Sequence, residues 1–381
     1  MKKIILIGPI PPPYNGQSVS FKMLIGAISN KFSNFAVVNI SPENEFPRKF
    51  EKLIRISEYL KVLYRFVASF KFKKSIVYIT ISQAKPGFFR DAAIIWLARI
   101  TKTRIITHVK GGYYDGLYKS LPFCFKKFLS VTLCQVDAII VLSENLKAMF
   151  DFNKSLAPKL CVVPNGLPIS KDNLPPEPKS ISEGAAIRIL YLSNLIESKG
   201  YLDVLKAVDI LRNRWKLNIK CNFCGEFKTN EDDITIQSSD HAKKIFFDFI
   251  DANGLAEYVK YIGNVAGVQK NNELREAHFF ILPTNFNKEG QPVSIIEAMA
   301  FGCVIISTKY RAIPSMVIED YNGLFVEYGA PEQIAGAVTD ISSNAQKFRQ
   351  MSRNSIDFYN REFTQEKHLK QIIPIITGDK A

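Results

Sequence analysis

Two glutamates, Glu289 and Glu297, are separated by seven residues in a segment that suits a ligand-binding loop. In NFNKEGQPVSIIEAMAFG, residues 285–302, a polar loop passes through Gly290 and Pro292 into the pattern of a helix start. Backbone N–H groups at a helix start bind anions and hydroxyl oxygens. A carboxylate accepts two hydrogen bonds, which suits a vicinal diol such as the ribose 2′ and 3′ hydroxyls. On charge spacing alone, a solvated loop glutamate and a helix-surface glutamate would look the same.

The same segment, in its context EGQPVSIIEAMAFGCVII, resembles the E-x7-E signature of glycosyltransferase family 4, a group of retaining enzymes with the GT-B fold. The resemblance implies that Glu289 contacts the donor sugar and acts at the reaction centre, and that Glu297 holds the ribose. It also implies that the intervening backbone surrounds the sugar, through Gly290, Gln291, Pro292, Val293 and Ser294. The implied donor is a nucleoside diphosphate sugar, from which the sugar is transferred with retention of its anomeric configuration.

A basic residue that could meet the donor diphosphate is Lys199, in the segment YLSNLIESKG. This segment resembles the strand, loop and Lys-Gly element of the same family, and a lysine there acts as a point charge on the leaving phosphate. The family's usual Gly-Arg is replaced by Ser193-Asn194, so Asn194 is expected to offer the donor a hydrogen bond without charge.

Two further segments resemble the first-domain part of that family's site. A proline-rich loop ends at Gly16, where the backbone could approach the donor phosphates before a helix begins. The segment IITHVKGGYYDGLY resembles a strand that ends in His-Gly-Gly, but Lys110 directly precedes the glycines and His108 lies two residues earlier. Alternation along a strand puts both on one side. We expect His108 at the reaction centre, with Lys110 contacting an acceptor phosphate or the donor.

The elements that must position these residues alternate between short Val- and Ile-rich runs and longer helical patterns. Such runs are typical of buried parallel strands, and they are predicted over residues 4–7, 36–40, 76–81, 105–108, 138–142, 160–163, 188–192, 217–223, 259–262, 279–282, 304–308 and 323–326. Helices are predicted over residues 18–29, 92–101, 144–150, 199–213, 243–253 and 331–342, with two more between 346 and 376. The alternation predicts an α/β fold with two tandem Rossmann-like, doubly wound domains.

A proline-rich stretch, residues 171–185, interrupts the alternation and predicts a linker. We therefore expect an N-terminal acceptor-binding domain over residues 1–170 and a nucleotide-sugar-binding domain over residues 186–355. The helical tail, residues 356–381, is expected to pack back on the N-terminal domain. Ligands in such sheets bind beyond the carboxyl ends of the strands, facing a cleft in the GT-B arrangement.

Composition places the chain among ordinary globular proteins. It has 381 residues, of which 47% are hydrophobic and 23% charged, and no apolar run is long enough to span a bilayer. Six cysteines are too sparse for a disulfide framework, and the pair Cys221 and Cys224 is interpreted as part of a strand. These features predict a cytoplasmic protein.

The basic charge is concentrated in the first half. Residues 1–172 hold 26 Lys and Arg against 10 Asp and Glu, whereas residues 173–381 hold 24 against 26. The stretch over residues 48–74 carries nine of these basic residues interleaved with aromatic and aliphatic ones. It is typical either of an interfacial helix on an anionic membrane or of a solvated helix packed on the sheet. If residues 48–74 form the interfacial helix, the protein binds peripherally to the inner face of the cell membrane, and this is the location that we expect. We also expect its acceptor to be a lipid-linked glycan in polysaccharide assembly.

Other functions fit parts of this pattern. A nucleotide-sugar epimerase or sugar-phosphate synthase with the same fold would use the same donor site, and a nucleic-acid-binding protein would use the basic half. No nucleic-acid recognition motif is visible, so no nucleic-acid partner is expected. No D-x-D metal motif stands out, so we expect transfer without a metal or other cofactor.

Overall fold

The computed structural model describes residues 3–12, 16–41, 51–70, 75–170, 174–175, 177–231 and 233–379, with the side chains of residues 51–54 left out. The chain forms two compact units. Unit 1 comprises Met1–Pro168 together with Gln365–Ala381, and unit 2 comprises Ile169–Thr364.

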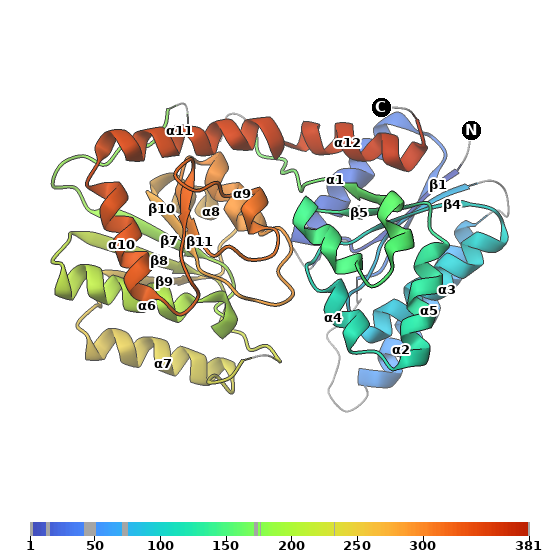
Figure 1. The fold of residues 1–381 in the computed structure, drawn as a ribbon, viewed down its shortest axis with the longest axis horizontal. Helices are drawn as coiled ribbons and strands as arrows, with labels where there is room; N and C mark the ends of the chain where they lie inside the picture. Colours follow the sequence, from blue (N-terminus) through green and yellow to red (C-terminus); the bar gives the residue numbers. More distant parts are fainter. Residues whose placement is uncertain are drawn as a thin grey trace. The chain divides into compact units, whose positions relative to one another are not determined.

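Unit 1 is built on a six-stranded parallel sheet of order β2-β1-β3-β4-β5-β6. Its strands are β1 (Lys3–Gly8), β2 (Phe35–Asn39), β3 (Ser75–Thr80), β4 (Arg104–His108), β5 (Ala138–Val141) and β6 (Leu160–Val162). Helices α1 (Gly16–Lys31) and α12 (Gln365–Thr377) cover one face of the sheet (Figure 1). The other face is covered by α2 (Glu51–Ser69), α3 (Lys85–Ile100) and α5 (Phe123–Cys134), and the short α4 (Tyr114–Lys119) lies beside them.

The sheet of unit 1 is buried on both faces, which explains its Val- and Ile-rich strands. All six residues of β3 and all four of β5 are buried. On the α1 side, Ile4, Leu6, Tyr78 and Ile106 pack with Ile372 of α12 in one core cluster. Helices on both faces are the usual reason for continuous apolar strands in parallel sheets.

Unit 2 repeats this architecture with the order β12-β11-β10-β7-β8-β9. Its strands are β7 (Ile187–Leu192), β8 (Ile219–Cys224), β9 (Val259–Gly263), β10 (Phe279–Leu282), β11 (Val304–Ser307) and β12 (Gly323–Phe325). Its helices are α6 (Tyr201–Asp209), α7 (Ser239–Ala252), α8 (Gly267–Glu276), α9 (Val293–Ala300), α10 (Pro331–Ser342) and α11 (Ala345–Glu362). Helices α6, α7 and α10 lie on one face of this sheet, and α8, α9 and α11 lie on the other (Figure 1).

Each sheet has a topological switch point, at which successive strands stop being added on one side of the first strand and continue on its other side. In unit 2 the chain runs outward from β7 to β9 and then returns to place β10 beside β7. In unit 1 the corresponding neighbours are β1 and β3. Ligands of doubly wound sheets bind at such switch points, beyond the carboxyl ends of the strands.

The segment predicted as a linker, residues 171–185, is partly integrated into unit 2. Residues 171–173 and 176 lie outside the described residues, but Lys179 is anchored in unit 2. Its Nζ donates to the carbonyl oxygens of Leu274 and Arg275 at 2.6 and 3.0 Å, and its backbone N–H donates to Ser352 Oγ at 2.8 Å. A linker was predicted because the segment is rich in proline and has no apolar periodicity. In the structure, Lys179 holds the segment on unit 2 by donating hydrogen bonds to the free carbonyl groups at the end of α8.

The remaining differences concern ends and short helices. The tail was predicted from residue 356, whereas unit 1 takes up the chain from Gln365. Phe358 belongs to unit 2, where its ring meets those of Tyr321 and Phe363. The predicted helix over residues 144–150 is a 3-10 helix, and α4, α5 and α8 were not predicted. Cys221 and Cys224 lie buried on β8 as free thiols.

Candidate functional site

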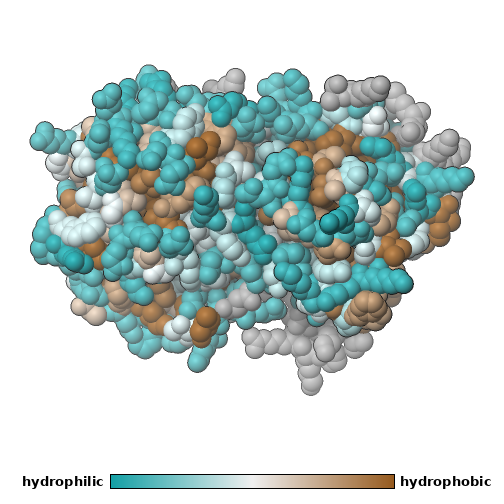
Figure 2. Space-filling view, viewed as in Figure 1, coloured by the Kyte–Doolittle hydropathy of each residue, from teal (hydrophilic) through white to brown (hydrophobic). Residues whose placement is uncertain are grey.

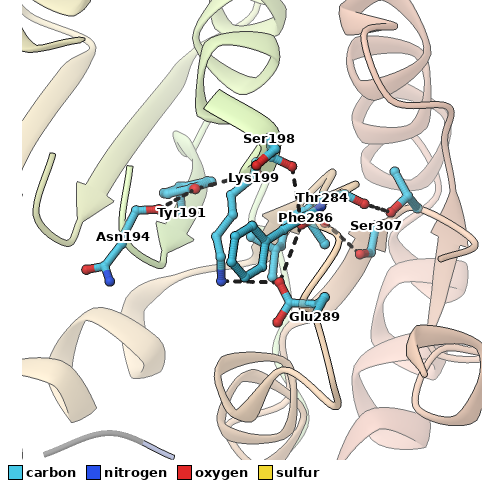
Figure 3. Close-up of polar contacts among 10 residues, drawn as sticks. Tyr191, Asn194, Ser198, Lys199, Thr284, Phe286, Glu289 and Ser307 are labelled. Carbon is cyan, nitrogen blue, oxygen red and sulfur yellow. Dashed lines mark hydrogen bonds and ion pairs between the residues drawn. The ribbon is translucent and has the colours of Figure 1, made fainter. Parts of the chain in front are cut away.

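The polar residues predicted to bind the donor come from the loops that follow β7 and β10. Lys199 ends a 3-10 turn, Glu197–Lys199, after β7, and Glu289 lies in the loop after β10. Because β7 and β10 are neighbours at the switch point, these side chains meet although 90 positions separate them in the sequence. Lys199 Nζ lies 3.2 Å from Glu289 Oε2 in an ion pair that is largely buried (Figure 3).

Both members of this ion pair are held by further contacts. Thr284 Oγ1 donates to Glu289 Oε2 at 3.4 Å, and the Lys199 ammonium lies 5.0 Å from the centre of the Phe286 ring. Asn285 N–H donates to the carbonyl oxygen of Ser198 at 2.8 Å, which ties the β10 loop to the turn that carries Lys199. The carboxylate of Glu289 is therefore oriented before any ligand arrives.

Glycine is required at position 200, between Lys199 and α6. Gly200 has a φ of 74°, and a Cβ there would lie 2.3 Å from the carbonyl oxygen of Pro283. Only a residue without a side chain allows the turn after β7 to approach the loop after β10 this closely. The Lys-Gly pair of the sequence thus has a steric reason as well as an electrostatic one.

Glu197, which sequence reasoning did not single out, anchors the other side of the turn. Its carboxylate accepts backbone N–H groups of Ile234, Thr235 and Ile236 at 3.0, 2.9 and 3.1 Å. Burial raises the pKa of this carboxyl, but these hydrogen bonds outweigh that effect and lower its pKa below the ordinary value. The charged form of Glu197 therefore holds the loop after β8 against the Lys199 turn.

Helix α9 begins at Val293, directly after Pro292, as the sequence indicates. The preceding residues Gly290, Gln291 and Pro292 are buried, whereas Val293 and Ser294 are partly exposed. Gln291 Nε2 donates to Ser315 Oγ at 3.2 Å, which fixes the loop at the helix start. The N–H groups in the first turn of a helix lack intrahelical partners and can receive phosphate or hydroxyl oxygens.

Glu297 lies about one turn into α9, where it forms an ion pair with Lys270 of α8. Lys270 Nζ lies 2.5 Å from Glu297 Oε1, and both side chains remain partly exposed. Lys270 was missed because α8 has a single buried residue, Leu274, and so shows no apolar stripe. Its position after a strand and a glycine-containing loop was the available signal.

Asn194, which was expected to offer the donor a hydrogen bond, is exposed in the loop after β7. Its carbonyl oxygen accepts from Tyr191 Oη at 3.1 Å, and its side-chain amide points away from Glu289 (Figure 3).

In unit 1, Lys110 lies beyond the carboxyl end of β4 beside the first turns of α1. Its Nζ donates to Ser20 Oγ at 2.9 Å and to Asn165 Oδ1 at 3.1 Å. Both partners are neutral, and burial lowers the pKa of Lys110 to about 7. Gly16 starts α1 as predicted, but residues 13–15 of its loop lie outside the described residues. Asn165, in the turn after β6, thus supplies a hydrogen-bond acceptor for Lys110.

His108 is completely buried in unit 1. Its Nδ1 is 2.7 Å from Tyr78 Oη, and its ring stacks on His368 of α12 with centroids 6.5 Å apart. Burial first, and then the charge of Lys110, hold the pKa of His108 well below its ordinary value. Lys110 is also buried, with 9% of its surface exposed, and the placement of His108 at the reaction centre stays a prediction. The alternation along β4 correctly placed both residues on one side of the sheet, but it did not predict how deeply each side chain is buried.

Replacing Lys110 with methionine is expected to stabilise unit 1 at low pH. The unfolded chain keeps a lysine proton up to its ordinary pKa of 10.5, whereas folded Lys110 releases it above about 7. The cost of burying the cation is therefore fully present below pH 7 and disappears between pH 7 and 10.5. We expect Lys110→Met to raise the free energy of unfolding at pH 6 by roughly 2–4 kcal/mol, and this gain to vanish towards pH 10. Denaturant unfolding measures it, with exposed Lys127→Met as the control; a difference independent of pH would contradict the assignment.

The described residues contain no group of three or more His, Cys, Asp or Glu side chains that could hold a metal ion. Metal-independent transfer stays a prediction.

Two glycosyltransferases are similar to parts of this chain. CapH, a capsular polysaccharide biosynthesis glycosyltransferase of Staphylococcus aureus, is 29% identical over 125 residues, 32% of this chain and 30% of CapH. AmsK, an amylovoran biosynthesis glycosyltransferase of Erwinia amylovora, is 26% identical over 160 residues, 41% of this chain and 36% of AmsK. The matches thus span less than two thirds of these relatives.

Solved structures match the whole chain. The crystal structure of HepE from Anabaena in complex with UDP superposes with a TM-score of 0.72 and 14% identity, covering 99% of this chain and 100% of HepE. With two parallel six-stranded sheets and alternating helices, this confirms the predicted GT-B fold class. The model of the family described as "Glycosyl transferases group 1" matches residues 177–358. This segment, which contains Lys199, Glu289 and Glu297, belongs to the glycosyl transferases group 1 family.

Proposed function

We propose that this protein is a retaining glycosyltransferase that moves a sugar from a nucleoside diphosphate sugar to a hydroxyl of a lipid-linked glycan. The observation that carries the proposal is the Lys199–Glu289 ion pair at the switch point of unit 2, next to the start of α9. A cation, an oriented carboxylate and a helix start are the groups that a diphosphate and a sugar need side by side. Two similar proteins support a role in polysaccharide assembly: CapH is a glycosyltransferase of capsular polysaccharide biosynthesis and AmsK one of amylovoran biosynthesis.

The residues divide the donor between them. In this proposal, Glu289 accepts hydrogen bonds from the sugar hydroxyls, and the backbone from Gly290 to Ser294 surrounds the sugar. Lys199 and the start of α9 take the diphosphate. As the bond between the sugar and the diphosphate breaks, charge grows on the leaving phosphate and Lys199 stabilises it. The acceptor oxygen forms the new bond to the anomeric carbon of the sugar, and its proton passes to the leaving diphosphate. Glu297 accepts from the ribose hydroxyls.

Unit 1 supplies an anion site in this proposal. The lowered pKa of Lys110 means that a phosphate arriving at its Nζ would favour the protonated amine, because an anion stabilises the cation that burial disfavours. The phosphates of a lipid diphosphate acceptor or of the donor fit this chemistry. Among relatives of this fold, HepE was crystallised with UDP, which makes UDP-sugars our first candidate donors.

A thermal-shift screen of UDP-, GDP-, ADP- and dTDP-sugars tests the donor class. We expect the melting temperature to rise with one nucleotide family, because a ligand that binds only the folded state stabilises it by mass action. Product analysis with and without a polyprenyl-diphosphate glycan then separates transfer from epimerisation. Turnover of the sugar nucleotide without acceptor would contradict transfer, and loss of transfer in EDTA would contradict metal independence.

A further inference from the structure

A group of exposed apolar side chains lies on one face of unit 1, away from the residues considered above. All the large hydrophobic side chains that unit 1 exposes among its described residues belong to α2, α3 and α5. They are Ile56, Leu60, Tyr64, Val67, Phe89, Trp96, Leu97, Ile100, Phe123, Phe125, Phe128 and Val131. We call this surface the α2–α3–α5 face. In Figure 2, apolar residues reach the surface among hydrophilic ones at the lower right, where α3 and α5 run.

Helix α2 has two apolar stripes, of which the core of unit 1 uses one. Val62 and Phe66 are buried against the sheet. Ile56, Leu60 and Tyr64 recur at the spacing of one helix face but point to solvent, with Tyr64 75% exposed. A solvated helix packed by a single face would carry polar residues there. The second stripe therefore has no role inside unit 1.

The exposed side chains of α3 and α5 continue one another. The rings of Phe89 and Phe125 meet edge to face with centroids 5.2 Å apart. Trp96 Nε1 donates to Thr132 Oγ1 at 3.1 Å, which joins the helices about two turns further on. The most exposed apolar residues of these two helices are Phe123, at 85%, and Ile100, at 78%. Contiguous exposed apolar surface of this kind marks a docking surface in soluble proteins.

Positive charge accompanies this apolar surface. Exposed basic residues described on or beside these helices include Arg55, Lys61, Arg65, Lys85, Arg99, Lys102 and Lys127. The acidic side chains described on the same helices are Glu58, 2.9 Å from Lys61, and Asp91, which is buried against Arg90. Phenylalanine, tryptophan and isoleucine with interspersed Lys and Arg are what the headgroup region of an anionic bilayer selects.

We infer that the α2–α3–α5 face docks on an anionic lipid bilayer, with Phe123, Ile100 and Tyr64 entering the headgroup region. The basic stretch predicted over residues 48–74 has residues 48–50 and 71–74 outside the described residues. The inference extends it to α3 and α5, for which the sequence indicated no membrane contact. Across the described chain, no helix is both long and apolar enough to span a bilayer. A symmetric pair of chains would instead bring this basic face against itself. The inference goes beyond the proposed function and does not depend on it.

Vesicle sedimentation of the full chain tests this inference. We expect binding to phosphatidylcholine vesicles that contain phosphatidylglycerol, weaker binding to phosphatidylcholine alone, and weaker binding as salt rises. Phe123→Ser with Ile100→Ser should lower the partition coefficient at least about tenfold, because burial of each apolar side chain contributes to binding. Arg65→Glu with Lys127→Glu should lower binding to anionic vesicles alone. The matched control is Ile234→Ser with Val268→Ser, two exposed apolar residues of unit 2, at 94% and 76%.

The two tryptophans of the chain give an independent readout, because Trp96 lies on this face and Trp215 lies in unit 2. In the Trp215→Phe variant, anionic vesicles should shift the fluorescence of Trp96 to the blue, and in Trp96→Phe they should not shift that of Trp215. Equal loss of binding in the control pair, or no binding by wild type, would overturn the inference. So would a dimer in sedimentation velocity that Phe123→Ser dissociates. These assays need no nucleotide, and the donor screen needs no vesicles, so either result stands alone.

Discussion

The Lys199→Ala variant is expected to lose sugar transfer by roughly 10²–10³-fold, chiefly in kcat. Lys199 is the cation beside Glu289 at the switch point of unit 2, and the proposed leaving diphosphate develops charge there. An interaction that strengthens as the bond breaks lowers kcat when it is removed, whereas one made equally in the ground state raises KM. Lys206→Ala is the matched control, because Lys206 is exposed on the following helix, α6. Transfer at the wild-type rate with saturating donor would contradict the role.

The same substitution also leaves Glu289, which is 7% exposed, without its cation. Loss of one partner of a largely buried pair costs roughly 1–3 kcal/mol, so unfolding must be measured alongside turnover. The variant Lys199→Met with Glu289→Gln removes both charges and should recover most of that stability without recovering transfer. Recovery of both would mean that the pair serves the fold alone.

The Glu297→Ala variant is expected to bind UDP about tenfold more weakly or worse, because hydrogen bonds to a charged acceptor contribute roughly 1.5–3 kcal/mol. Glu297 is partly exposed one turn into α9, and Lys270 holds its carboxylate at 2.5 Å. Titration calorimetry measures the loss, with Glu332→Ala on the exposed start of α10 as the control.

A ligand-side comparison identifies the atoms involved. Wild type should prefer UDP over its 2′,3′-dideoxy analogue, and Glu297→Ala should lose that preference, because the hydroxyls then have no carboxylate to donate to. The alternative is that the ion pair only joins α8 to α9, and Lys270→Met tests it. That variant should keep the preference for UDP over the dideoxy analogue if Glu297 binds the ribose. An unchanged preference in Glu297→Ala would show that the ribose lies elsewhere.

Local sequence patterns account for the strands and for most of the donor loop. All twelve predicted strands are present, and residues 279–282 and 331–342 match β10 and α10 end for end. Runs of Val and Ile specify buried parallel strands because both faces of such a sheet are covered. The start of α9 followed from Pro292 and the apolar periodicity after it. Helix α8 was not predicted, because it buries only Leu274 and therefore has no apolar periodicity.

Depth and partners were not available from those patterns. Alternation placed His108 and Lys110 on one side of β4, but packing of His368 and Tyr78 buries His108 fully and leaves Lys110 at the edge. The exposed second stripe of α2 looks in sequence like any amphipathic face, because periodicity does not show which stripe meets the sheet.

For this protein, then, the sequence by itself determined the α/β alternation, the residue types of the donor loop and the basic character of the first half. The tertiary structure decided that β10 lies beside β7, which brings Lys199 to Glu289, and that α8 brings Lys270 to Glu297. The physical reason is that strand order depends on packing between distant segments. The patterns that specify a strand are local, and they are the same for every neighbour that it could have.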